Sequence, residues 1–167
     1  MVFTVSLDFK NKTNDAVLKE VEKSIKMLSK ASVISGVIDE DERTSRMAHE
    51  NEFGMPTTFD YGPYKGETVF DPPRPFVDAP ERTGTEEIKN YIEFMSAGEK
   101  FSTKAIKDML DGCGEIMSKQ QKDMIEAWGD IQDNSERTVE TKGFNRPLHD
   151  RNNKPFPIKY KVLLGGA

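Results

Sequence analysis

Prolines gather in one part of this chain of 167 residues and limit the structure that can form there. Each proline fixes its own φ angle and pushes the preceding residue away from helix. The same stretch, residues 51–82, also holds six aromatic residues, which a disordered linker would lack. The residues concerned are Pro56, Pro63, Pro72, Pro73, Pro75 and Pro80, with Phe53, Phe59, Tyr61, Tyr64, Phe70 and Phe76. We therefore expect residues 51–82 to form a functional loop that is ordered by packing against something.

The residues before this loop have the pattern of a strand, a helix and a second strand. Apolar residues alternate over residues 3–9, which predicts a strand with one apolar face. Over residues 15–30 apolar side chains recur every three or four positions, which predicts an amphipathic helix. Residues 33–38 are rich in β-branched side chains and predict a strand that ends at the acidic residues 39–42.

Two helices and a closing strand are predicted after the loop. Residues 85–95 and 102–128 carry apolar side chains at helical spacing. Gly112 and Gly114 lie inside the second helix, where each glycine costs about 1 kcal/mol relative to alanine, so they indicate a close helix crossing or a break. Residues 130–153 are polar and rich in turn residues, and alternation from Phe156 onwards predicts a half-exposed strand.

These patterns predict an α+β fold. A small, mainly antiparallel sheet is packed on one face by two or three helices, and a long loop rich in proline and aromatic residues leaves it. The length fits a single domain covering residues 1–167, in which residues 51–82 form an extended interaction loop or arm. Hydrophobic residues make up 35% of the chain and charged residues 32%, so the core is expected to be thin.

The composition also argues against several classes of function. A net charge of -5 argues against a domain whose whole surface follows nucleic-acid phosphates, so DNA binding would need a local basic patch. The apolar runs are too short to cross a membrane, and the first residues lack the features of a secretion signal. The only cysteine, Cys113, cannot form an internal disulfide and lies on an apolar helix face, where we expect it to be a buried core residue.

The sequence contains no recognisable catalytic motif. His49 lacks the second histidine of a zinc protease helix, because Phe53 stands in its place. His149 is followed by Asp150, but a dyad of this kind would need a serine or cysteine brought near by the fold, and both histidines fit surface turns better. Four consecutive acids at residues 39–42 fit a solvated turn better than a metal site. We therefore expect no catalytic residue, no cofactor and no metal.

The segment 71–76 (DPPRPF) is held extended by its prolines and presents Arg74 and Phe76 at a defined separation. An arm with so little conformational entropy to lose is suited to lie against another subunit. It could equally wrap the sheet of its own domain and cover an edge. Both alternatives stay open at the level of the sequence.

Several motifs resemble those of the neck and tail-completion proteins of tailed bacteriophages, a virion-morphogenesis family. Residues 48–54 (AHENEFG) and 72–77 (PPRPFV) resemble its Asn-Glu-Phe-Gly and Ile-Pro-x-Arg-Pro-Phe signature. Residues 142–148 (KGFNRPL) and 158–162 (IKYKV) resemble its Pro-Leu turn and closing strand. The insert between the two signature segments is longer here than is usual for the family.

The resemblance implies a structural virion protein that is assembled in the host cytoplasm. It would form a homo-oligomeric ring, with a hexamer favoured, at the head–tail junction or the top of the tail. Its partners would be other neck or connector proteins and tail-tube or tail-terminator proteins, while genomic DNA passes through the channel without specific binding. No membrane, cofactor or catalysis is implied. We expect a subunit interface formed by Phe53, Tyr61, Tyr64, Pro73, Arg74, Pro75 and Phe76.

Two other classes of function remain as alternatives. Lys154, Lys159 and Lys161, near the closing strand, would suit a small DNA-binding or DNA-processing accessory factor. His149 and Asp150 would suit a hydrolase with a further nucleophile.

Overall fold

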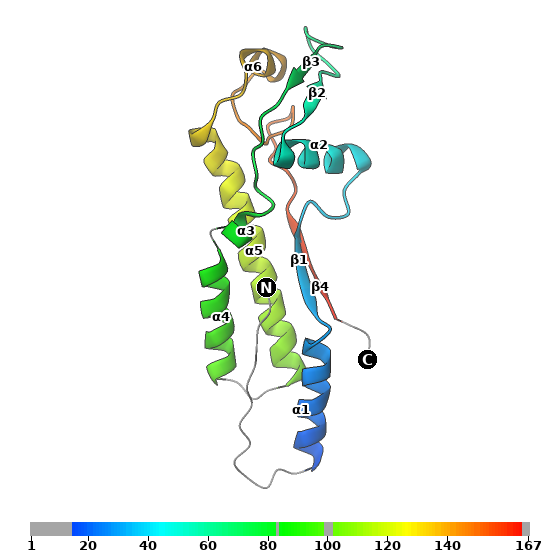
Figure 1. The fold of residues 1–167 in the computed structure, drawn as a ribbon, viewed down its shortest axis with the longest axis vertical. Coiled ribbons are helices and arrows are strands. Elements are labelled where there is room, and N and C mark those ends of the chain that lie inside the picture. Colours follow the sequence, from blue (N-terminus) through cyan, green and yellow to red (C-terminus); the bar gives the residue numbers. More distant parts are fainter. Residues whose placement is uncertain (1–14, 83, 99–101, 165–167) are drawn as a thin grey trace.

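One long helix organises the molecule. The computed structural model describes residues 15–82, 84–98 and 102–164. Helix α5 (Thr103–Ile131) runs along much of the length of an elongated molecule, and the other elements lie along it (Figure 1). The protein is α+β, as the sequence predicts.

The described part of the chain holds six helices and four short strands. In chain order these are α1 (Asp15–Leu28), β1 (Ser32–Gly36), α2 (Glu42–Phe53), β2 (Pro56–Thr58), β3 (Thr68–Phe70), α3 (Ala79–Arg82), α4 (Thr85–Gly98), α5, α6 (Glu136–Lys142) and β4 (Lys159–Leu163). The helices predicted over residues 15–30, 85–95 and 102–128 are confirmed as α1, α4 and α5. The strand predicted over residues 3–9 lies outside the described residues.

The strands form two antiparallel pairs, β1 with β4 and β2 with β3. Val33 lies opposite Val162 and Ser35 opposite Tyr160, and these four side chains are half-buried. Residues between them point away and are exposed, and α5 packs against both strands. The prediction of a half-exposed closing strand is therefore confirmed, and the structure shows that its partner is β1.

Gly112 and Gly114 in α5 mark close approaches rather than a break. A Cβ atom added to Gly112 would lie 2.0 Å from the hydroxyl oxygen of Tyr91 on α4. A Cβ atom added to Gly114 would lie 2.2 Å from the ring of Tyr160 on β4. The helix is continuous through both positions, so the predicted close helix crossing is confirmed and the alternative of a break is wrong. Cys113, between them, is buried as expected, and burial raises the pKa of its thiol.

A fully buried polar side chain joins α5 to two other segments. Gln121 accepts a hydrogen bond from the Ser35 hydroxyl at 2.6 Å. Its amide donates to the main-chain oxygens of Ser35 at 3.2 Å and Val77 at 2.6 Å. Because a buried amide is costly unless it is hydrogen-bonded, these contacts fix β1 and the chain after the prolines against α5.

Three helices were not predicted from the sequence: α2, α6 and the four-residue α3, which lies inside the expected loop at 51–82. Residues 39–42 were expected to be a solvated turn, but the side chain of Asp41 accepts the Thr44 N–H at 2.9 Å and begins α2. Residues 130–153 were expected to be turns, but Ser135 begins α6 in the same way, accepting the Thr138 N–H at 3.2 Å.

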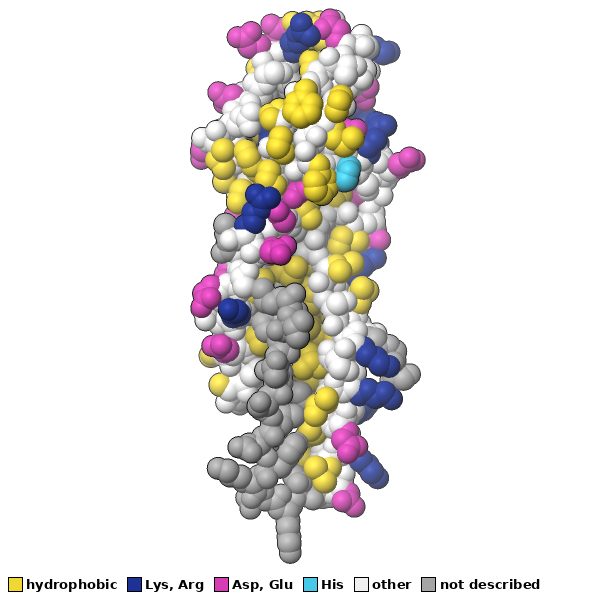
Figure 2. All heavy atoms as spheres, viewed as in Figure 1, with side chains coloured by type: hydrophobic (Ala, Val, Ile, Leu, Met, Phe, Trp, Pro, Cys, Tyr) yellow, Lys and Arg dark blue, Asp and Glu magenta, His cyan; other side chains and the backbone are white. Residues whose placement is uncertain are grey.

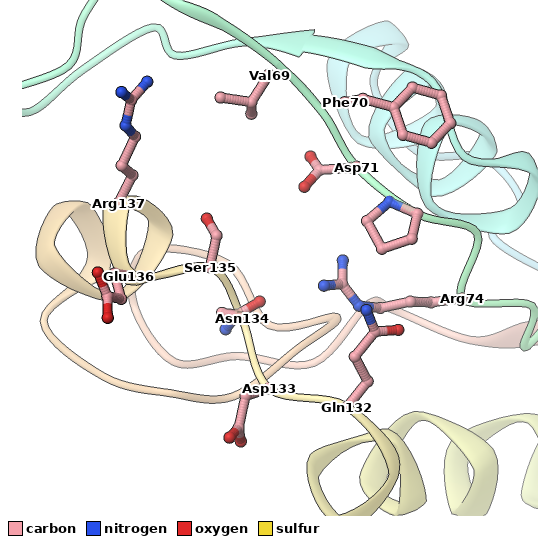
Figure 3. A pocket seen from close by; sticks show the side chains of 11 residues that line it. Val69, Phe70, Asp71, Arg74, Gln132, Asp133, Asn134, Ser135, Glu136 and Arg137 are labelled. Atoms are coloured by element: carbon pink, nitrogen blue, oxygen red, sulfur yellow. The ribbon is translucent and has the colours of Figure 1, made fainter.

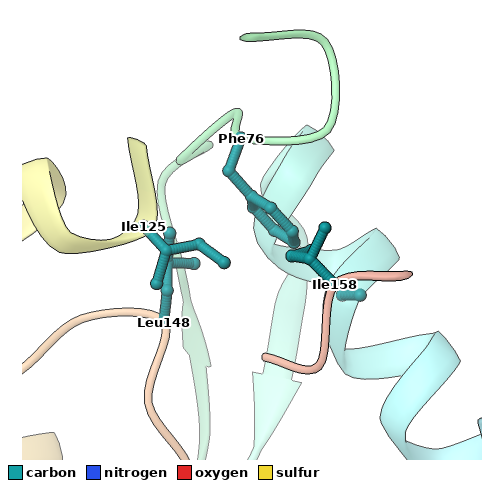
Figure 4. Packing of buried hydrophobic residues seen from close by; sticks show 5 residues of the cluster. Phe76, Ile125, Leu148 and Ile158 are labelled. Carbon is teal, nitrogen blue, oxygen red and sulfur yellow. The ribbon is translucent and has the colours of Figure 1, made fainter. Parts of the chain in front are cut away.

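The main hydrophobic cluster lies between α2, α5, the segment after β3 and the segments that contain Leu148 and Ile158 (Figure 4). Its most enclosed large side chain, Phe76, stacks on Phe156 with ring centroids 5.6 Å apart. The buried members are Ala48, Phe76, Ile125, Leu148 and Ile158. Residues from five separate parts of the sequence thus meet in one small core.

Candidate functional site

The stretch at residues 51–82 folds back onto its own domain. It begins inside α2, continues as the β2–β3 hairpin, and then runs extended along the cluster to α3 (Figure 1). At the hairpin, the side chains of Thr58 and Thr68 share a hydrogen bond of 2.8 Å. The loop is therefore ordered by packing, as predicted, and its support is this chain itself.

The two signature segments bind each other, and we call this contact the motif junction (residues 51–54 with residues 73–77). The Glu52 carboxylate accepts the main-chain N–H groups of Phe76 at 2.8 Å and Val77 at 2.9 Å. The main-chain oxygen of Asn51 accepts the Arg74 N–H at 2.7 Å. Hydrogen bonds between a carboxylate and main-chain N–H groups are among the stronger ones, so Glu52 fixes the extended segment at the end of α2.

Two of the expected interface residues are buried in the single chain. Phe76 has 0% of its surface exposed and Arg74 has 4%. Both side chains are therefore enclosed largely by their own chain, and their predicted role in a subunit interface stays a prediction. Pro75 is half-buried, and its main-chain oxygen accepts the indole N–H of Trp128 at 3.1 Å.

Tyr61 and Tyr64, in the loop of the β2–β3 hairpin, contact residues from the C-terminal part of the chain. The hydroxyl of Tyr64 donates to the Glu140 carboxylate on α6, a contact that raises the pKa of Tyr64. The Arg137 guanidinium lies 5.2 Å from the Tyr64 ring centre, and that of Arg151 lies 5.9 Å from the Tyr61 ring centre. Both rings are half-buried by these contacts. Their predicted role in a subunit interface stays a prediction.

Large apolar side chains are exposed at the hairpin end, and we call them the hairpin patch (Phe53, Met55 and Phe70). Phe53 is 65% exposed, Phe70 is 67% and Met55 is 39%. The Asp71 N–H donates to the Met55 main-chain oxygen at 3.1 Å, and Pro56 pairs with Phe70, which brings these residues together. Figure 2 shows hydrophobic side chains gathered over this end. Pro73, another predicted interface residue, is also exposed.

A second apolar surface lies on α1, and we call it the α1 patch (Val17, Leu18 and Ile25). Their exposed fractions are 49%, 36% and 42%. At about 100° per residue these positions fall within an arc of about 100° on the helix surface. The apolar stripe of α1 is therefore wider than the part that α5 covers. Aromatic residues dominate the hairpin patch, whereas the α1 patch is aliphatic.

The residues of the two alternative functions are engaged elsewhere. Lys159 pairs with Glu40 at 2.6 Å and Lys161 with Asp39 at 2.5 Å, so acidic partners offset two of the three lysines. His149 is buried rather than in the expected surface turn, and its Nδ1 lies 2.8 Å from the Pro147 main-chain oxygen.

Asp150 is engaged in a turn rather than with His149. Its carboxylate accepts the N–H groups of Asn152 at 2.8 Å and Lys154 at 2.9 Å. Asn153 in this turn has a φ of 58°, the left-handed conformation that asparagine tolerates.

Lys142 should make stability depend on pH. Its ammonium group donates to the His149 main-chain oxygen at 2.7 Å, and burial followed by repulsion from Arg74 lowers its pKa to about 8. Because the unfolded chain then binds the proton more strongly, stability should rise by about 1–2 kcal/mol between pH 8 and pH 10. Urea unfolding at several pH values should show this rise in the wild type and a flatter profile in Lys142→Met. Equal slopes in the two proteins would contradict the assignment.

No group of three or more His, Cys, Asp or Glu side chains among residues 15–82, 84–98 and 102–164 is arranged to hold a metal ion. Within the same residues, no helix is long and apolar enough to cross a membrane. Comparison of the chain with protein-family models, with curated proteins and with solved structures gives no match.

Proposed function

We propose that this chain is a structural virion protein of a tailed bacteriophage, which forms a homo-oligomeric ring at the head–tail junction or the top of the tail and joins head to tail. The phage context is supported by the resemblance of residues 48–54, 72–77, 142–148 and 158–162 to the neck and tail-completion family. The ring is supported by the two exposed apolar patches.

The observation that carries the proposal is the position of these patches. The hairpin patch and the α1 patch lie at opposite ends of an elongated molecule (Figure 1). One patch is mainly aromatic and the other aliphatic, so a contact between them joins unlike surfaces of two subunits. Contacts between unlike patches of identical subunits repeat from one subunit to the next, and they close into a ring when the rotation between neighbours allows it.

In this proposal the hairpin patch of one subunit contacts the α1 patch of the next. Burial of aromatic side chains such as Phe53 and Phe70 would then contribute most of the contact energy. The other partners would be neck or connector proteins and tail-tube or tail-terminator proteins. The net charge of -5 suits a channel through which DNA slides without being held, because like charges repel.

A pair of charge substitutions tests the contact between unlike patches. Phe70→Asp and Ile25→Asp should each weaken self-association at least about tenfold, because a carboxylate would be buried in an apolar contact. Phe94→Asp is the matched control, since Phe94 is 75% exposed on α4 and belongs to neither patch. Size-exclusion chromatography with light scattering reports the masses.

Mixing the two variants makes the test sharper. Each variant keeps one intact patch, so an equimolar mixture should form a 1:1 heterodimer that grows no further. A mixture that stays monomeric, or single variants that assemble like the wild type, would show that these patches do not join subunits. Averaged electron microscopy of the native particle should separately place a symmetric ring on the tail axis, and absence from any symmetric assembly would reject the virion role.

A further inference from the structure

An open cavity lies beside the motif junction, and Phe70 of the hairpin patch is one of the residues that line it. It has a volume of about 440 Å³ and separates the segment after β3 from the segment that links α5 to α6 (Figure 3). The first wall contributes Phe70, Asp71 and Arg74, and the second contributes Gln132, Asn134 and Arg137. Polar side chains from two distant parts of the sequence therefore face one space.

Arg74 is the unusual member of this cavity. Only 4% of its surface is exposed, and its Nε atom is buried without a hydrogen-bond partner. Within the described part of the chain, its guanidinium forms no ion pair, although its main-chain N–H is bonded to Asn51. Burial lowers the pKa of Arg74, and the charge of Asp71 opposes this only in part. Figure 3 shows the guanidinium pointing into the cavity beside Gln132.

A second donor in the same cavity also lacks an acceptor. The side-chain nitrogen of Asn134 is buried and has no hydrogen-bond partner, whereas its main-chain N–H donates to the Asn145 side chain at 2.9 Å. Buried donors are normally satisfied, and a buried positive charge is normally paired. Two unsatisfied donors on facing walls of one cavity point to an acceptor that is absent from the isolated chain.

The charges around the cavity indicate which acceptor would fit. Arginine binds carboxylate and phosphate oxygens through parallel hydrogen bonds. Three acids, Asp71, Asp133 and Glu136, also line this cavity and would repel a doubly charged phosphate more strongly than a singly charged carboxylate. The ammonium group of Lys142 is close enough to Arg74 for the two charges to repel, so a single negative charge would relieve both.

We propose that this cavity is a binding site for a carboxylate group, which accepts hydrogen bonds from the Arg74 guanidinium and the Asn134 side-chain amide. The carboxylate belongs either to a small carboxylic acid or to an acidic residue of a second copy of this chain. The two proposed binding residues, Arg74 and Asn134, belong to neither the hairpin patch nor the α1 patch, so either proposal can fail while the other stands.

The test is an acetate titration of the full chain, followed by NMR of the arginine Nε–H and asparagine side-chain signals. Sodium chloride keeps the ionic strength constant, and the protein is kept dilute enough to stay monomeric. The signals of Arg74 and Asn134 should move saturably, while that of Arg46, an exposed arginine paired with Glu50, should not. No saturable movement, or movement with phosphate but not with acetate, would overturn the proposal.

Variants test the assignment without removing the buried arginine. Asn134→Asp places a carboxylate in the cavity and should weaken acetate binding at least about tenfold. Asn90→Asp makes the same change on the exposed surface of α4 and should leave acetate binding within about twofold. Unchanged acetate binding by Asn134→Asp would count against the site.

The source of the carboxylate follows from a second series without acetate. If the Arg74 signal moves to its acetate-bound position as the protein concentration rises, a second copy supplies the group. If it moves only with acetate, the ligand is a small carboxylic acid. Either result supports the site.

Discussion

Replacement of Phe76 by alanine should lower the free energy of unfolding by about 3–5 kcal/mol. The ring is fully buried, stacks on Phe156 and touches a cluster assembled from separate parts of the chain. Removal of the ring would leave a cavity that the surrounding segments, fixed by Glu52 and Gln121, cannot easily fill. Urea unfolding monitored by circular dichroism measures the change.

Phe53 provides the matched control for this experiment. It belongs to the same proline-rich stretch but is 65% exposed, so Phe53→Ala should change stability by less than about 0.5 kcal/mol. The opposite pattern, in which Phe76→Ala folds with unchanged stability and loses only self-association, would show that Phe76 is an interface residue after all.

Replacement of Gly54 by alanine should lower the free energy of unfolding by about 3 kcal/mol or more. Gly54 has a φ of 68°, which strains any residue with a Cβ atom. The added Cβ atom would also lie 2.6 Å from the main-chain nitrogen of Pro73. Backbone cannot rotate away as a side-chain end can, so the motif junction would have to separate.

The variant Gly66→Ala separates the effect of backbone strain from the effect of the steric clash at Gly54. The φ of Gly66 is 91°, but a Cβ atom there would meet nothing within 4 Å. Gly66→Ala should therefore cost only the conformational strain, about 1–2 kcal/mol. Thermal and urea unfolding of both variants measure the difference, and an equal loss in the two would mean that the contact between Gly54 and Pro73 is unimportant.

Local patterns in the sequence predicted the elements that bury a clear apolar face. Helices α4 and α5 carry long apolar stripes, and β4 alternates cleanly, so each was visible from spacing alone. Helix α2 was not predicted because most of its twelve residues are polar or charged and show no apolar stripe. Its start depends on the single cap at Asp41. The strands β2 and β3 have three residues each, which is too short for an alternating pattern to be recognised.

Only part of the candidate site could be predicted from the sequence. Residues in 51–54 and 72–77 were assigned to a contact between subunits, and in the structure these two segments contact each other within one chain. An arginine and a phenylalanine on a rigid extended segment suit burial within a subunit as well as burial between subunits. Composition does not say which chain supplies the partner, whereas the structure buries Arg74 and Phe76 largely within their own chain. The unpaired donors of the cavity depend on tertiary distances and leave no trace in the sequence.

The pairing of β1 with β4 also sets an order of events during folding. Residues 32–36 find their partners at residues 159–163, across almost the whole described chain, whereas α4 and α5 are neighbours in sequence. Contacts between residues that are far apart in the sequence form slowly. The α4–α5 contact can therefore form before β1 pairs with β4. Ile158 directly precedes β4 and is a member of the core cluster, so it joins the cluster when β4 pairs. A chain interrupted before this point would keep its core open, and so incomplete products would be exposed to proteolysis before they could enter an assembly.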